Sequence, residues 1–128
     1  MKKREAEFTV YFRHWLKANP MKSGAFELKQ TTTNSLDFSD VKDHQLDALL
    51  ASNSKSLGFL YKIPDDSRGI KPYDMIYLRD SKSYLVIKYP KFFVLIDPFV
   101  FVEEKTISNR KSLTSERARE ISTIAIDL

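Results

Sequence analysis

The chain has 128 residues and no cysteine, which excludes disulfide bonds and zinc sites built on cysteine. Its hydrophobic fraction of 42% is enough for a packed core, and no apolar run reaches the roughly 18 residues of a membrane span. A net charge of +4 permits nucleic-acid binding but does not require it. We therefore expect a single cytoplasmic domain, residues 1–128, without membrane contact.

The first half of the chain predicts two helices separated by a strand. Apolar residues recur at helical spacing over residues 4–17, and residues 23–31 have the pattern of a strand. After a polar loop, Ser39 is a good N-cap for a helix that ends near residue 53. A strand at residues 58–63 would then lie parallel to the first strand, with the helix as the crossover.

The second half predicts mainly strands. They are expected at residues 74–78 and 83–88, which would form a hairpin, at 92–96, and after Pro98 at 100–102. Thr114 is the expected cap of a last helix over residues 115–124. This order of elements predicts an α/β fold in which a central mixed sheet is flanked by helices.

The most informative residues of the chain are Phe26-Glu27-Leu28-Lys29. Because side chains alternate along a strand, Glu27 and Lys29 share one face while Phe26 and Leu28 point to the other. Nucleases that use a metal ion often need such a pair, in which the carboxylate binds the metal and the lysine steadies a water nucleophile or the phosphate. The alternative is an ordinary ion pair on a strand face, worth a few tenths of a kcal/mol.

The second helix adds a polar residue on its inner face. Gln45 lies four residues after Val41 and four before Leu49, so it should face the sheet. Its amide either bonds a nearby backbone carbonyl or points towards Glu27 and helps to position a phosphate or water. His44 is one position away from this face, and we expect it to contact the DNA backbone or solvent rather than a metal.

These segments resemble the core of the PD-(D/E)XK nuclease superfamily, and within it the RecU-type Holliday-junction resolvases in a small, phage-type variant. The matching stretches are Phe26-Glu27-Leu28-Lys29-Gln30-Thr31, Phe38-x-x-Val41-x-x-His44-Gln45-x-x-x-Leu49 and Gly58-Phe59-Leu60. The resemblance implies a restriction-endonuclease-like core and a Mg²⁺- or Mn²⁺-dependent endonuclease that cuts branched DNA in recombination. It also implies a homodimer, since a junction has two-fold symmetry.

The same resemblance assigns roles to individual residues. Glu27 would be the motif carboxylate and a metal ligand, Lys29 the motif lysine, and Gln45 the glutamine of the helix. The family also has a catalytic glutamate on its first helix, which would be Glu7, with Glu5 as the other choice.

The chain departs from the family at the second metal ligand, because no Asp or Glu lies between Glu7 and Glu27. Asp74, which follows Pro72-Tyr73 at the start of a predicted strand, is the best candidate to replace the missing ligand. Weaker candidates are Asp65 and Asp66, and a second register that pairs Asp74 with Val86-Ile87-Lys88 puts a valine where the carboxylate belongs.

Basic residues are predicted to hold the DNA backbone together with His44, and they are Lys2, Lys3, Arg4, Arg13, Lys17 and Lys22. A second basic group contains Arg110, Lys111, Arg117 and Arg119. Two other interpretations stay open. The protein can be a catalytically inactive nucleic-acid-binding or interaction module on the same fold, or a phage-type accessory protein in which the Glu27–Lys29 pair is purely structural.

Overall fold

The computed structural model describes residues 2–19 and 23–128, and of residues 2–6 the backbone alone. The helices in these ranges are α1 (Lys2–Ala18), α2 (Asp43–Asn53), α3 (Pro98–Ile107) and α4 (Ser115–Ile121), with a 3₁₀ turn η1 (Phe38–Asp40). The strands are β1 (Phe26–Gln30), β2 (Ser35–Asp37), β3 (Phe59–Lys62), β4 (Met75–Leu78), β5 (Tyr84–Lys88), β6 (Phe92–Ile96), β7 (Ser112–Thr114) and β8 (Ile124–Asp127).

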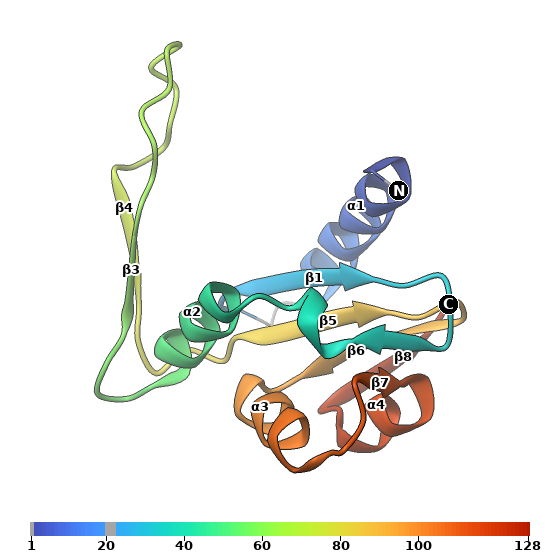
Figure 1. The fold of residues 1–128 in the computed structure, drawn as a ribbon. Coiled ribbons are helices and arrows are strands. Elements are labelled where there is room, and N and C mark those ends of the chain that lie inside the picture. The colour runs from blue at the N-terminus through green and yellow to red at the C-terminus, as the bar shows by residue number, and fades with distance from the viewer. Residues whose placement is uncertain (1, 20–22) are drawn as a thin grey trace.

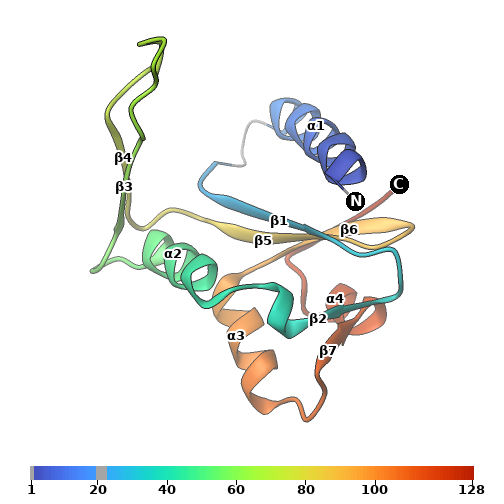
Figure 2. The same ribbon diagram turned by 45° about the horizontal axis from the view of Figure 1, so that its top comes forward.

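The fold is α/β with a mixed central sheet, as predicted (Figure 1). The sheet has the order β1-β5-β6-β8, in which β1 and β5 are parallel and the other neighbours are antiparallel. Helix α1 covers one face, and α2, α3 and α4 lie on the other (Figure 2). The short strands β2 and β7 pair beside the sheet on the α3 and α4 side.

Alternation along the central strands divides the core into two clusters. Leu85 and Ile87 of β5 pack with residues of α2, α3 and α4, whereas Val86 packs with Phe8 and Phe12 of α1. The whole run from Leu85 to Ile87 is fully buried, which is typical of a strand covered on both faces. This run explains why β5 takes the central place next to β1.

The predicted strand pairings were wrong in two places. The parallel partner of β1 is β5, not the strand at residues 58–63. That strand, β3, instead pairs antiparallel with β4, so residues 74–78 and 83–88 do not form a hairpin. The backbone N–H groups of Asp80 and Ser81 donate to carbonyls at the end of α2, and this connection leads the chain from β4 into the central sheet.

The β3–β4 hairpin forms a projecting arm, residues 57–78, that leaves the body of the protein beside α2 (Figures 1 and 2). Its base packs against α2. Its strands carry exposed side chains on both sides, among them Leu60, Tyr61 and Tyr77. The arm is therefore the part of the fold least covered by the rest of the described chain.

Two further segments also differ from prediction. Helix α2 starts at Asp43 rather than after Ser39, because the buried Val41 has an extended backbone that separates it from η1. Residues 100–102 are helical, since Pro98 occupies the first turn of α3 and the Asp97 carboxylate accepts the Phe99 N–H at 2.8 Å. The predicted segments that the structure confirms as helix or strand include α1, β1, β3, β4, β5 and β6.

The C-terminal helix begins as predicted and ends early. The Thr114 hydroxyl accepts a hydrogen bond from the Arg117 N–H at 3.2 Å and so caps α4. The helix stops at Ile121 because Ile124 to Asp127 form the edge strand β8, which the sequence did not predict. In the part of the chain that the structure describes, no helix combines the length and apolar character needed to cross a membrane.

Candidate functional site

The packing of β1 fixes the orientation of the Glu27–Lys29 pair. Phe26 and Leu28 pack in the α1 cluster, where the Phe26 and Phe12 ring centroids are 5.4 Å apart. Glu27 and Lys29 are the register partners of Leu85 and Ile87, so they lie on the opposite face, towards α2. The structure thus confirms the predicted division of the strand into an apolar and a charged face.

The two charged groups are close together at the rim of the sheet. Lys29 Nζ lies 3.6 Å from Glu27 Oε2, and the two side chains are 21% and 30% exposed, respectively. This exposure leaves both groups accessible to a ligand. The buried strand β5, which pairs with β1, holds their backbones in place. The arrangement can present a carboxylate and an ammonium to one phosphate or one water molecule.

Two cavities border this edge of the sheet. The smaller, about 250 Å³, is lined by Phe8 and Thr9 of α1 and by residues 27–30 of β1. The larger, about 460 Å³, lies where the parallel strands β1 and β5 end and is lined by Glu7, Phe8, Tyr11, Gln30, Thr31, Thr32, Lys88, Pro90 and Leu128. Phe8 and Gln30 line both cavities, so the two form neighbouring parts of one surface beside β1.

Gln30 is a site residue that sequence reasoning missed. Its Oε1 atom is buried and has no hydrogen-bond partner among the described residues. A buried amide oxygen without a partner costs about 1–3 kcal/mol, so a donor from a ligand or water would stabilise it. The available signal was its position directly after Lys29, at the carboxyl end of a parallel strand, where α/β sheets commonly bind ligands.

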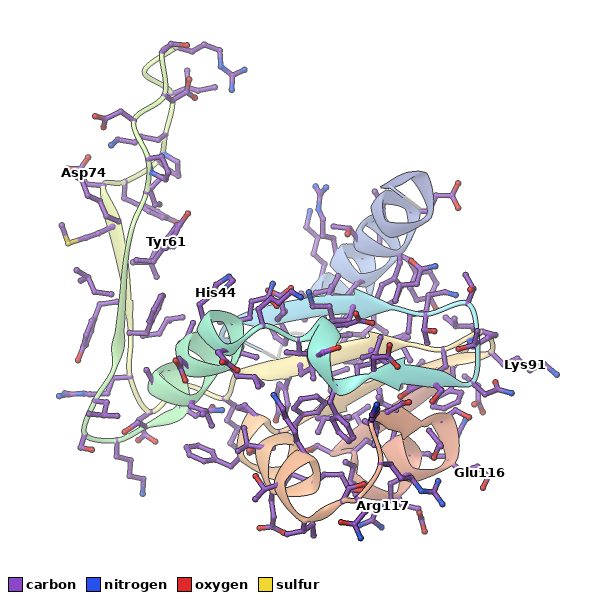
Figure 3. All side chains as sticks on the ribbon, viewed as in Figure 1. His44, Tyr61, Asp74, Lys91, Glu116 and Arg117 are labelled. Carbon is purple, nitrogen blue, oxygen red and sulfur yellow. The ribbon has the colours of Figure 1, made fainter. Side chains whose placement is uncertain are left out.

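The other residues predicted to be catalytic or to contact DNA lie on the helices beside the sheet. Glu7 is exposed and lines the larger cavity on the α1 side, across the sheet edge from Glu27. Gln45 is half-buried, and its Oε1 accepts the Lys42 N–H at 3.0 Å, which caps the start of α2. Gln45 thus has a local backbone partner, but this partner is an N–H group that donates to the side chain rather than the carbonyl that the sequence predicted. His44 is exposed on α2 (Figure 3).

Within a single chain, Asp74 does not lie near Glu27. Asp74 directly precedes β4 on the projecting arm, away from β1 (Figure 3). Its carboxylate is 80% exposed and lies 3.3 Å from Lys71 Nζ, which is also 2.7 Å from the Asp65 carboxylate. Asp66 pairs with Arg68 in the same loop. The candidates for a second metal ligand are thus all carried by the arm.

A hard cation needs more than the pair provides in one chain. Mg²⁺ prefers six oxygen ligands and is usually held by at least one or two carboxylates. Among the side chains that the structure describes, those of residues 7–19 and 23–128, no three His, Cys, Asp or Glu gather into a group that could hold a metal ion. The alternative register, which pairs Asp74 with Val86-Ile87-Lys88, does not supply a ligand either, because Val86 is fully buried in the α1 cluster. Glu27 alone therefore does not fit a complete Mg²⁺ site.

The basic residues are only partly described. Arg13 and Lys17 are exposed on α1, whereas the side chains of Lys2, Lys3, Arg4 and Glu5, and all of Lys22, lie outside the described residues.

In the C-terminal basic group, two guanidinium groups have partners within the chain. Arg117 makes bonds of 2.9 and 3.0 Å to the Glu104 carboxylate, and these bonds raise the Arg117 pKa. Arg119 lies over the Phe92 ring, 4.0 Å from its centroid, and pairs with Asp127. The α1 residues are therefore the better candidates for phosphate contacts.

Comparison with protein-family models, curated proteins and solved structures found no match to this chain.

Proposed function

We propose that the protein is a metal-dependent DNA endonuclease that acts on branched DNA as a homodimer. The observation that carries this proposal is the Glu27–Lys29 pair, partly exposed on the edge strand β1 with its charged groups 3.6 Å apart. Metal-dependent nucleases often use a carboxylate and a lysine side by side near the scissile phosphate, the first to bind the metal and the second to hold a water or a phosphate oxygen.

In this proposal each of the named residues has one role at the phosphate, at the metal ion or on the DNA backbone. Lys29 holds a phosphate oxygen or the attacking water, because its ammonium can donate hydrogen bonds to either. Glu27 supplies one oxygen ligand, and a bound Mg²⁺ or Mn²⁺ would supply the charge that stabilises the transition state. Arg13 and Lys17 on α1 bind the DNA backbone through salt-dependent contacts. The restriction-endonuclease-like core implied by the resemblance belongs to this proposal.

A cleavage assay tests the proposal. The wild-type protein is incubated with a labelled four-way junction and with a linear duplex of the same sequence, in Mg²⁺, in Mn²⁺ and in EDTA. We expect cuts in the junction with either metal and none in EDTA. Absence of metal-dependent cuts under all of these conditions would refute the nuclease.

A second candidate is a DNA-binding module without activity. It is favoured by the missing carboxylate, since the described residues hold no group of three metal-ligating side chains. For this candidate we expect junction binding that weakens steeply with salt, no cleavage, and no effect of Glu27→Ala on affinity. A gel-shift titration at two salt concentrations, run beside the cleavage assay, separates the two functions.

A further inference from the structure

The arm exposes more apolar surface than a single chain should leave in water. Eight large apolar side chains between residues 57 and 78 are 39–73% exposed, and they are Leu57, Leu60, Tyr61, Ile70, Tyr73, Met75, Ile76 and Tyr77. An isolated two-stranded hairpin is at best marginally stable in water, and exposed apolar surfaces of this kind usually bind a partner. Something is therefore expected to cover the arm.

The size of this surface fits a second copy of the chain. At about 100 Å² from each of these side chains, the eight residues together offer about 800 Å² over the two sides of the arm, which is comparable to what a standard stable interface buries on each partner. Two copies that exchange arms reciprocally would bury two such surfaces, and a two-fold symmetric contact of this kind closes on itself.

The central sheet offers a matching place for the arm. The Tyr84 N–H donates to the Ala25 carbonyl at 2.9 Å, and the Thr31 N–H donates to the Lys88 carbonyl at 3.0 Å. In the parallel register, the backbone groups of Phe26, Leu28 and Gln30 therefore point away from β5. Among the described strands none pairs with this outer edge, so a strand from another chain can be added there.

We propose that in a homodimer the arm of each copy lies along the outer edge of β1 in the other copy and places Asp74 beside Glu27. Asp74 directly precedes β4, so the register of β4 on that edge that lays Asp74 opposite Glu27 would bring its carboxylate to the Glu27–Lys29 pair. In the single chain, Asp74 forms an ion pair with Lys71, whose Nζ atom lies 3.3 Å from the Asp74 carboxylate. In the dimer, two carboxylates from different chains would lie close enough to share one cation.

This inference extends the proposed function, because it supplies the second carboxylate that the site in one chain lacks. It accounts for two separate observations, the uncovered arm and the incomplete site.

Disulfide trapping tests the arrangement without relying on activity. The chain has no cysteine, so the double variant Glu27→Cys/Asp74→Cys contains only the two introduced thiols. Mild oxidation joins them only where their Cα atoms are about 4.4–6.8 Å apart. We expect a covalent dimer on a non-reducing gel. The matched control is Glu27→Cys/Glu116→Cys, with Glu116 exposed on α4, and it should stay monomeric (Figure 3).

The other outcomes of the trapping experiment overturn the inference. A disulfide within one chain would mean that the arm folds back on its own sheet, and free thiols in the folded double variant would mean that Asp74 does not reach Glu27. A wild-type protein that sediments as a monomer would refute the arm exchange as well. A covalent dimer together with a wild type that cuts no DNA would leave the two-chain arrangement standing and refute the nuclease alone.

Discussion

Replacement of the Glu27–Lys29 pair should cost little stability, and this expectation separates a functional pair from a structural one. The charges are 3.6 Å apart and the side chains are 21–30% exposed. Two unit charges at about 4 Å attract each other by about 1 kcal/mol in water, and measured exposed pairs contribute about 0.2–1 kcal/mol. We therefore expect a coupling energy of about 0.5 kcal/mol between the two side chains.

The coupling is measured by urea unfolding of the wild type, Glu27→Gln, Lys29→Met and the double variant. The cycle isolates the pairwise contribution because each single variant removes the ion pair. A coupling energy above about 2 kcal/mol would contradict the reasoning, since values of that size belong to buried pairs. It would favour the accessory-protein interpretation, in which the pair serves only to stabilise the fold.

Three further predictions concern the core and the entry to β1. Tyr89 is fully buried and its hydroxyl donates to the Leu113 carbonyl at 2.9 Å, so Tyr89→Phe should lower the unfolding free energy by about 1–3 kcal/mol, against little change for the exposed Tyr77→Phe. Burial raises the Tyr89 pKa above its ordinary 10.0, so the folded state holds this proton more tightly. The wild type should therefore lose stability as the pH rises above 10.0, more steeply than Tyr89→Phe in the same denaturant titrations. Gly24 has φ +134° and a Cβ there would collide with the Lys82 carbonyl, so Gly24→Ala should lower the melting temperature more than Gly69→Ala, whose Cβ meets no atom within 4 Å.

The sequence was informative where local forces determine structure. Helix α1 follows from apolar spacing, the start of α4 from the Thr114 cap, and the two faces of β1 from alternation. These features depend on residues a few positions apart, so their signals are present in the chain itself. The short run at 100–102 was ambiguous because so few apolar residues fit a strand or a helix equally well.

Strand pairing could not be predicted in the same way, because it depends on contacts between residues far apart in the chain. The runs at 59–62 and 84–88 both carry apolar residues on both faces, so their sequences do not separate them, yet only the second is buried in the folded chain and lies at the centre of the sheet. The same limit applies to the site. The alternation of side chains along a strand predicted that Glu27 and Lys29 share a face. The position of Asp74 relative to Glu27 depends instead on the direction in which the arm leaves the body of the protein.

The rate of DNA cleavage by Lys29→Met tests the central claim most directly. Under single-turnover conditions with Mg²⁺ or Mn²⁺, we predict that this variant cuts a four-way junction at least about 100-fold more slowly than the wild type. A loss of this size is expected when a group that assists proton transfer or stabilises the charge on the phosphate is removed. Lys91→Met, an exposed lysine in the turn between β5 and β6, is the matched control and should keep the wild-type rate (Figure 3). A folded Lys29→Met protein that cuts the junction as fast as the control would contradict a catalytic role for the pair.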